Sequence, residues 1–146
     1  MMKADRIRAM TNTAPQGIAL ITGGNRGIGY ATALSLAKRN IPIIFTSRDA
    51  ARGAASAERI RDLVPDAQVE VLSLDLASMR SIREFAAGFL ARRTPLRALI
   101  NNAGANFPGG LDESKPDGFE ASVALNLTAS YRLTVGLRAA LRASTA

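Results

Sequence analysis

Short apolar runs alternate with longer amphipathic stretches from residue 17 onward. The first run, IALIT at 18–22, has no polar alternation, as expected of a strand covered on both faces. Similar runs follow at 41–46, 69–74 and 96–100. Because parallel strands need long crossovers between them, this alternation predicts an α/β fold with a doubly wound parallel sheet.

Helical spacing of apolar residues fills the intervals between these runs. Helices are expected over 28–39, from a cap at Asp49 to about residue 64, from a cap at Ser78 to about residue 93, and from Asp117 almost to the end. Asn40 offers a left-handed stop to the first helix. Residues 17–146 are therefore predicted to form an open, doubly wound Rossmann-type sheet, behind a disordered tail at 1–16.

Composition excludes several kinds of chemistry. Hydrophobic residues make up 47% of the chain, and neither cysteine nor histidine occurs, so disulfides, thiolate nucleophiles and imidazole bases are absent. No apolar run reaches the ~18 residues of a membrane span, and the first sixteen residues lack a signal-peptide core, so we expect a cytoplasmic protein. The net charge of +7 is spread along the helices without aromatic residues between the arginines, which does not favour nucleic acid as a partner.

A glycine-rich turn connects the first run to the first helix. Gly23 lets the backbone leave the strand, Gly27 lets a ligand approach, and Gly29 lets the helix pack closely. The start of a helix presents unpaired N–H groups and the positive end of its dipole, which favour a diphosphate. The turn therefore predicts a dinucleotide site, because it follows the first strand and opens a helix within a repeated strand–helix pattern.

Three motifs in order resemble the short-chain dehydrogenase/reductase family. They are TGGNRGIG at 22–29, NNAG at 101–104, and the Asp75 of LDL after the third run. The segments SRDAARG, LDLASMRSIREFA and DGFE are most similar to the branch that contains retinol dehydrogenases and protochlorophyllide reductases. The resemblance covers residues 17 to about 143.

This resemblance implies roles for particular residues. Asn101 would tie neighbouring strands together, the backbone of Ala103 and Gly104 would line the cofactor, and Asp75 would hold the adenine amino group rather than cap the next helix. The predicted cofactor-binding residues are Thr22, Gly23, Asn25, Arg26, Gly27, Ile28, Gly29, Ser47, Arg48, Asp75, Leu76, Asn102, Ala103 and Gly104.

The end of the second run indicates which cofactor is bound. Thr46, Ser47 and Arg48 stand there, with Arg26 in the turn, and guanidinium groups suit a 2′-phosphate. Asp49 is an alternative ligand for a ribose hydroxyl, but it lies one residue further on and suits a helix cap. NADP is therefore preferred to NAD.

Hydride transfer in the family uses a serine, a tyrosine with a lysine four residues later, and an asparagine. Asn126 matches the asparagine, whereas neither Tyr30 nor Tyr131 is followed by that lysine. We expect the amino-terminal part of an NADP-dependent oxidoreductase that acts on a carbonyl or alcohol substrate, with a very low rate of turnover by itself. The alternatives are a non-catalytic NADP(H)-binding module and one half of a split enzyme.

In the family's strand order a fifth strand lies beside the fourth, so the resemblance implies that residues 17–146 are a partial Rossmann-type domain, which ends after the fourth strand and its following helix. The fourth run would become an uncovered edge of the sheet, and the last helix is apolar on more than one face. Self-association or pairing with a carboxy-terminal half is therefore expected. The apolar positions of that helix are Phe119, Val123, Leu127, Leu133, Leu137 and Leu141.

Overall fold

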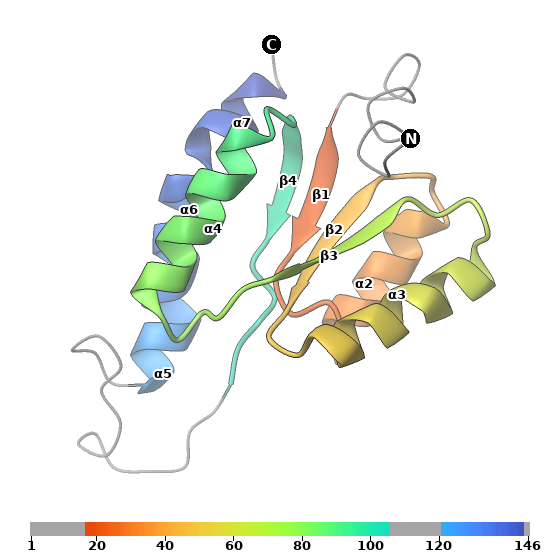
Figure 1. Cartoon of the computed structure of the whole chain (residues 1–146), viewed down its shortest axis with the longest axis horizontal. Coiled ribbons are helices and arrows are strands. Elements are labelled where there is room, and N and C mark those ends of the chain that lie inside the picture. The colour runs from red at the N-terminus through yellow and green to blue at the C-terminus, as the bar shows by residue number, and fades with distance from the viewer. Residues whose placement is uncertain (1–16, 106–120, 145–146) are drawn as a thin grey trace.

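The computed structural model describes residues 17–105 and 121–144. Its four strands are β1 (Ile18–Ile21), β2 (Ile43–Ser47), β3 (Val69–Ser73) and β4 (Leu96–Ile100). They form one parallel sheet in the order β3-β2-β1-β4, as Figure 1 shows. The carboxyl ends of all four strands therefore lie at one edge, called here the carboxyl edge.

Helices cover both faces of this sheet (Figure 1). Helices α2 (Gly27–Ala37) and α3 (Ala50–Leu63) pack on one face, and α4 (Met79–Ala91), α6 (Ala129–Gly136) and α7 (Arg138–Ala143) pack on the other. Alternate residues of β1 supply the two cores, because Ile18 and Leu20 lie on the α4 side and Ile21 on the α2 side. The doubly wound α/β fold is thus confirmed.

The structure confirms the predicted order of elements and several of their boundaries. Asp49 caps α3 by accepting a hydrogen bond from the backbone N–H of Arg52, and Ser78 caps α4. Asn40 adopts a left-handed conformation with φ +56° after α2. The predicted tail at 1–16 and the helix start at Asp117, with Phe119, lie outside the described residues.

The last helix is not the single regular helix that was expected. It consists of α5 (Ala121–Val123), a π-helical turn η2 (Ala124–Thr128), α6 and α7, with a break at Leu137. The π turn surrounds Asn126, whose side chain is engaged as described below. Just before the break, a Cβ on Gly136 would lie 2.9 Å from the Cβ of Ala86, so α6 approaches α4 closely there.

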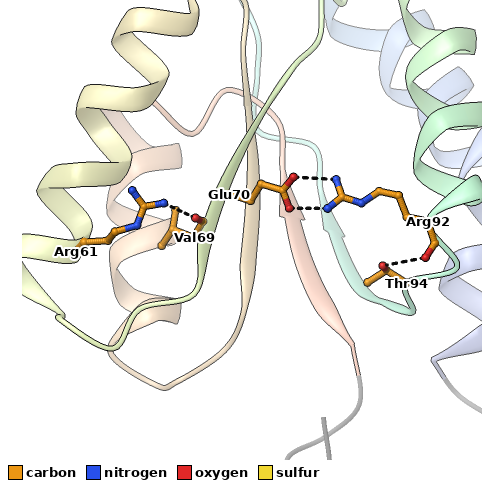
Figure 2. A network of polar contacts seen from close by, with 5 residues as sticks. All are labelled: Arg61, Val69, Glu70, Arg92 and Thr94. Carbon is orange, nitrogen blue, oxygen red and sulfur yellow. Dashed lines mark hydrogen bonds and ion pairs between the residues drawn. The ribbon is translucent and has the colours of Figure 1, made fainter. Parts of the chain in front are cut away.

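The two edges of the sheet differ. Figure 2 shows that β3 is tied to helices on both faces: Arg61 of α3 donates to the Val69 carbonyl at 2.6 Å, and Arg92 after α4 makes a bidentate pair with Glu70 at 3.0 and 2.6 Å. The opposite edge is β4, as the sequence predicted, and its last three residues are only half-buried.

Within the described ranges, 17–105 and 121–144, no helix has the length and apolar character needed to cross a membrane.

Candidate functional site

The turn between β1 and α2 depends on glycine at several positions. Gly23 has φ +69° and Gly27 has φ +55°, in the left-handed region where a side chain is strained. A Cβ on Gly24 would lie 2.3 Å from the Cβ of Phe45, so the turn also approaches β2 closely. A Cβ on Gly27 would meet no atom within 4 Å. The turn is therefore held tightly against β2, while its outer side at Gly27 is open.

The start of α2 has none of the usual protein groups that complete a helix terminus. Arg26 occupies the capping position without a side-chain hydrogen bond, and the first turn carries no acidic residue. Arg26, Gly27 and Ile28 are all exposed. The open space, the uncapped N–H groups and the positive end of the helix dipole fit a diphosphate.

A second loop, after β4, holds the turn from behind. The buried hydroxyl of Thr22 accepts hydrogen bonds from the backbone N–H groups of Asn102 and Ala103, both at 3.0 Å. The Asn102 side chain donates to the carbonyls of Thr22 and Gly23 at 3.0 and 3.2 Å. A Cβ on Gly29 would lie 2.3 Å from the Gly23 carbonyl oxygen, so only glycine fits there.

The prediction that Asn101 ties the strands is wrong, since Asn102 makes this connection. Asn101 instead donates to the Thr134 hydroxyl of α6 at 3.2 Å. Neighbouring side chains of an extended segment point to opposite sides. Asn102 therefore faces the glycine turn, whereas Asn101 faces α6.

The end of β2 supplies two hydroxyls and a free cation. Thr46 accepts a hydrogen bond from the Gly23 N–H at 3.3 Å, and Ser47 donates to the Asp49 carbonyl at 2.7 Å. Arg48 is exposed and has no ion pair or hydrogen bond among the described residues. The Asp49 carboxylate is engaged by the backbone N–H and guanidinium of Arg52, as expected of a cap.

Asp75 and Leu76 follow β3 and have different environments. Asp75 is exposed, and its carboxylate accepts a hydrogen bond from the Ala77 N–H at 3.0 Å. Ser78, not Asp75, caps α4, as the sequence predicted. Leu76 is buried in the core beneath α4, so only its backbone is available to a ligand at this edge.

Asn126 connects the last helix to the loop after β4. Its side-chain oxygen accepts from the Ala105 N–H at 3.0 Å, and its amide donates to the Ala105 carbonyl at 2.9 Å. A Cβ on Gly104 would lie 2.8 Å from that oxygen, so glycine allows the approach. The π turn places Asn126 for this pairing, and π turns are frequent at functional sites.

Sequence reasoning missed a further support from α3. Ser56 is buried and donates to the Asn25 carbonyl at 2.8 Å. Its position was detectable, because Gly53, Ser56, Ala57 and Ile60 share one face at helical spacing and a serine there needs a partner. No cluster of acidic side chains suited to a metal ion occurs in the described part of the chain.

A family model and the sequences of known proteins both match most of this chain. A family model described as short chain dehydrogenase matches residues 17–145. The chain is 42% identical to the chloroplastic short-chain dehydrogenase TIC 32 A of Brassica napus over 80% of its own length and 36% of the relative's. It is 40% identical to retinol dehydrogenase 12 of Homo sapiens, over 89% of the chain and 40% of the relative. It therefore spans less than half the length of these relatives.

Solved structures of short-chain dehydrogenases also resemble the chain. A metagenomic short-chain oxidoreductase in complex with NADP superposes with a TM-score of 0.74 and 33% identity, over 88% of this chain and 57% of that one. A short-chain dehydrogenase from Sphingobium yanoikuyae in complex with NADPH gives a TM-score of 0.69 and 33% identity, over 83% and 47% of the two chains.

Proposed function

The chain belongs to the short-chain dehydrogenase family, and we propose that it is the NADP(H)-binding part of an oxidoreductase acting on a carbonyl or alcohol. The observation that carries the proposal is the start of α2, where an uncapped helix terminus faces open space at Gly27. The NADP and NADPH complexes of similar structures support the choice of cofactor.

Each part of the cofactor has a matching group. The N–H groups of residues 26–29 would hold the diphosphate. Arg48 and Arg26 would hold the 2′-phosphate, since both are exposed cations and the nearby Asp49 is engaged as a helix cap. Asp75 would accept a hydrogen bond from the adenine amino group, since the Ala77 N–H occupies only part of the acceptor capacity of its carboxylate.

The reaction needs groups beyond those that this sequence supplies. When bound, the nicotinamide supplies or accepts the hydride. A proton must also move at the substrate oxygen, and a tyrosine with pKa about 10 does this poorly without a nearby cation. No tyrosine here has a lysine four residues later. We propose that these 146 residues bind NADPH with little turnover. The proposed NADP(H)-binding domain spans residues 17–146.

A second candidate function is assembly with another polypeptide or a second copy. Three apolar residues at helical spacing form an outer stripe on η2 and α6: Leu127, Tyr131 and Val135 are 66%, 64% and 51% exposed. The strand β4 also lies at the sheet edge. We propose that these surfaces associate, as in one half of a split enzyme. Light scattering is expected to show more than a monomer. A monomer that unfolds cooperatively only at high temperature would contradict this.

Cofactor titration tests the main proposal. NADPH is expected to bind saturably, and Arg48→Asp is expected to weaken NADPH about a hundredfold while NADH binding persists, because the new carboxylate repels the 2′-phosphate. Arg80→Asp on α4 is the matched control, since it makes the same charge change at an exposed arginine paired with Glu84. Absence of a signal with either cofactor at millimolar concentration would disprove the site.

A further inference from the structure

A hydrogen-bonded chain links α3 to the glycine turn. Ser56 of α3 is only 2% exposed, and its hydroxyl donates to the Asn25 carbonyl at 2.8 Å. Arg59, one turn further along α3, donates to the same hydroxyl at 2.9 Å. The Arg59 guanidinium also lies 5.0 Å from the ring centroid of Tyr30 in α2. These residues connect both helices of this face to one carbonyl of the turn.

The direction of the Ser56 hydrogen is fixed by chemistry. A serine hydroxyl has one hydrogen to donate and two lone pairs, whereas a guanidinium has donors only. Because Arg59 occupies a lone pair, the hydroxyl hydrogen is directed to the Asn25 carbonyl. The buried Ser56 hydroxyl therefore both donates and accepts a hydrogen bond. This orientation is stable, since leaving the hydroxyl or the Asn25 carbonyl unpaired would be unfavourable.

This contact also orients the next peptide N–H. A trans peptide is planar, so the N–H of Arg26 points opposite to the carbonyl of Asn25. Holding that carbonyl toward α3 turns the Arg26 N–H away from α3. The same contact keeps a carbonyl oxygen from turning toward bound phosphate, which it would repel. With its donor directed away from α3, the peptide between Asn25 and Arg26 is available to the proposed diphosphate.

We infer that Ser56 is a positioning residue for the diphosphate-binding turn, and that Arg59 holds its hydroxyl in the donating orientation. The inference rests on the proposed NADP(H) site and adds residues from α3, outside the motifs of that site. Neither residue contacts the cofactor in this inference. Their effect is confined to the part of the cofactor that the turn binds.

The test compares cofactors with and without the diphosphate, using the full chain. Ser56→Ala is expected to raise the Kd of both NADPH and NADH about tenfold, the effect of one lost hydrogen bond at the turn. The affinity for 2′-AMP, which lacks a diphosphate, is expected to stay within about twofold. Arg59→Ala is expected to raise the NADPH Kd about threefold, because the Ser56 donor remains but loses its orientation.

Arg61→Ala is the matched control on the same helix. Arg61 pairs with Glu58 and donates to the Val69 carbonyl, so its removal also breaks guanidinium contacts, but away from the turn. Its NADPH Kd is expected to equal that of the unmodified chain. An unchanged NADPH Kd in Ser56→Ala, or an equal loss of 2′-AMP, would overturn the inference. Failure of the unmodified chain to bind NADPH would overturn the proposed function itself.

Discussion

Within residues 17–105, three helices each follow a parallel strand, and they begin in two different ways. Helices α3 and α4 are completed by the side chains of Asp49 and Ser78, which accept hydrogen bonds from backbone N–H groups of the first turn. Helix α2 has neither a side-chain cap nor an acidic residue there. The N-termini of α3 and α4 are thus capped by side chains of the protein itself, whereas α2 has N–H groups available to a ligand.

The other ends of α3 and α4 strengthen this contrast. Arg61 near the end of α3 and Arg92 after α4 both bind the edge strand β3, from opposite faces of the sheet (Figure 2). Each of these helices is therefore fixed at both ends by the chain's own side chains. The start of α2 is held by the glycine turn and by Asn102 behind it. The proposed binding site thus lies where the helix terminus lacks a side-chain partner.

The largest expected effect comes from Gly29→Ala. Its Cβ would lie 2.3 Å from the Gly23 carbonyl and 2.5 Å from the Asn102 amide nitrogen, so the backbone of the turn must shift. We expect a loss of about 3 kcal/mol in unfolding free energy. NADPH binding should be lost with it. Urea unfolding and cofactor titration measure the two effects.

Gly88→Ala in α4 is the control for that substitution. Gly88 is exposed within a helix, and its added Cβ would meet no atom within 4 Å. Alanine should therefore stabilise the protein by about 0.5–1 kcal/mol and leave NADPH binding unchanged. Equal effects of the two substitutions would mean that the turn tolerates a side chain at Gly29.

The order of the strands and helices could be predicted from the sequence because local patterns determine it. Apolar runs mark the strands, and Asp49 and Ser78 mark two helix starts, each within a few residues. The glycine turn was also predicted, since its φ values at Gly23 and Gly27 demand glycine. Such features are contained in short segments.

Contacts between distant segments were not predictable in the same way. Asn101 and Asn102 are chemically identical, and only the path of the loop decides which one reaches Thr22 and Gly23. The hydrogen bond from Ser56 to Asn25 joins α3 to the glycine turn, 31 residues apart in the sequence. Asn126, which lies in the π turn, pairs with Ala105, a residue before the last helix. These features depend on tertiary packing rather than on local propensity.

Arg26→Asp would convert the start of α2 into one that resembles α3. Arg26 already has the extended backbone of a capping residue, with φ −158° and ψ 169°. An aspartate there should stabilise the unliganded protein by about 0.5–1 kcal/mol. It should also weaken NADPH about a hundredfold, because its charge repels the phosphates.

Arg26→Ala separates the added charge from the lost one. It should weaken NADPH by less than Arg26→Asp and should not raise the unfolding free energy. Thermal unfolding without cofactor and fluorescence titration with NADPH provide the two measurements. If aspartate stabilised the helix and NADPH still bound with unchanged affinity, the diphosphate would have to bind elsewhere.

Removing the cap of α4 is expected to lower stability without changing NADPH affinity, in contrast to Arg26→Asp. Ser78→Ala should lower the unfolding free energy by about 1 kcal/mol, since the Ser81 N–H loses its partner. The Kd for NADPH should not change. Ser73→Ala, at an exposed position at the end of β3, should change neither quantity. A weaker NADPH affinity in Ser78→Ala would show that the start of α4 also contributes to the site.

The smallest expected effect concerns the far end of α4, where Glu70 and Arg92 pair with both side chains 31% exposed. Glu70→Gln should cost about 0.5–1 kcal/mol at low salt and less in high salt, because the pair is bidentate but only half-buried. Glu84→Gln breaks a more exposed pair with Arg80, at 3.9 Å, and should cost less. Neither change should alter NADPH affinity, since neither pair includes a residue of the proposed site. A shift in cofactor affinity from Glu70→Gln would mean that the far end of α4 is coupled to the start of α2 through β3, and the contrast between α2 and α4 would no longer hold.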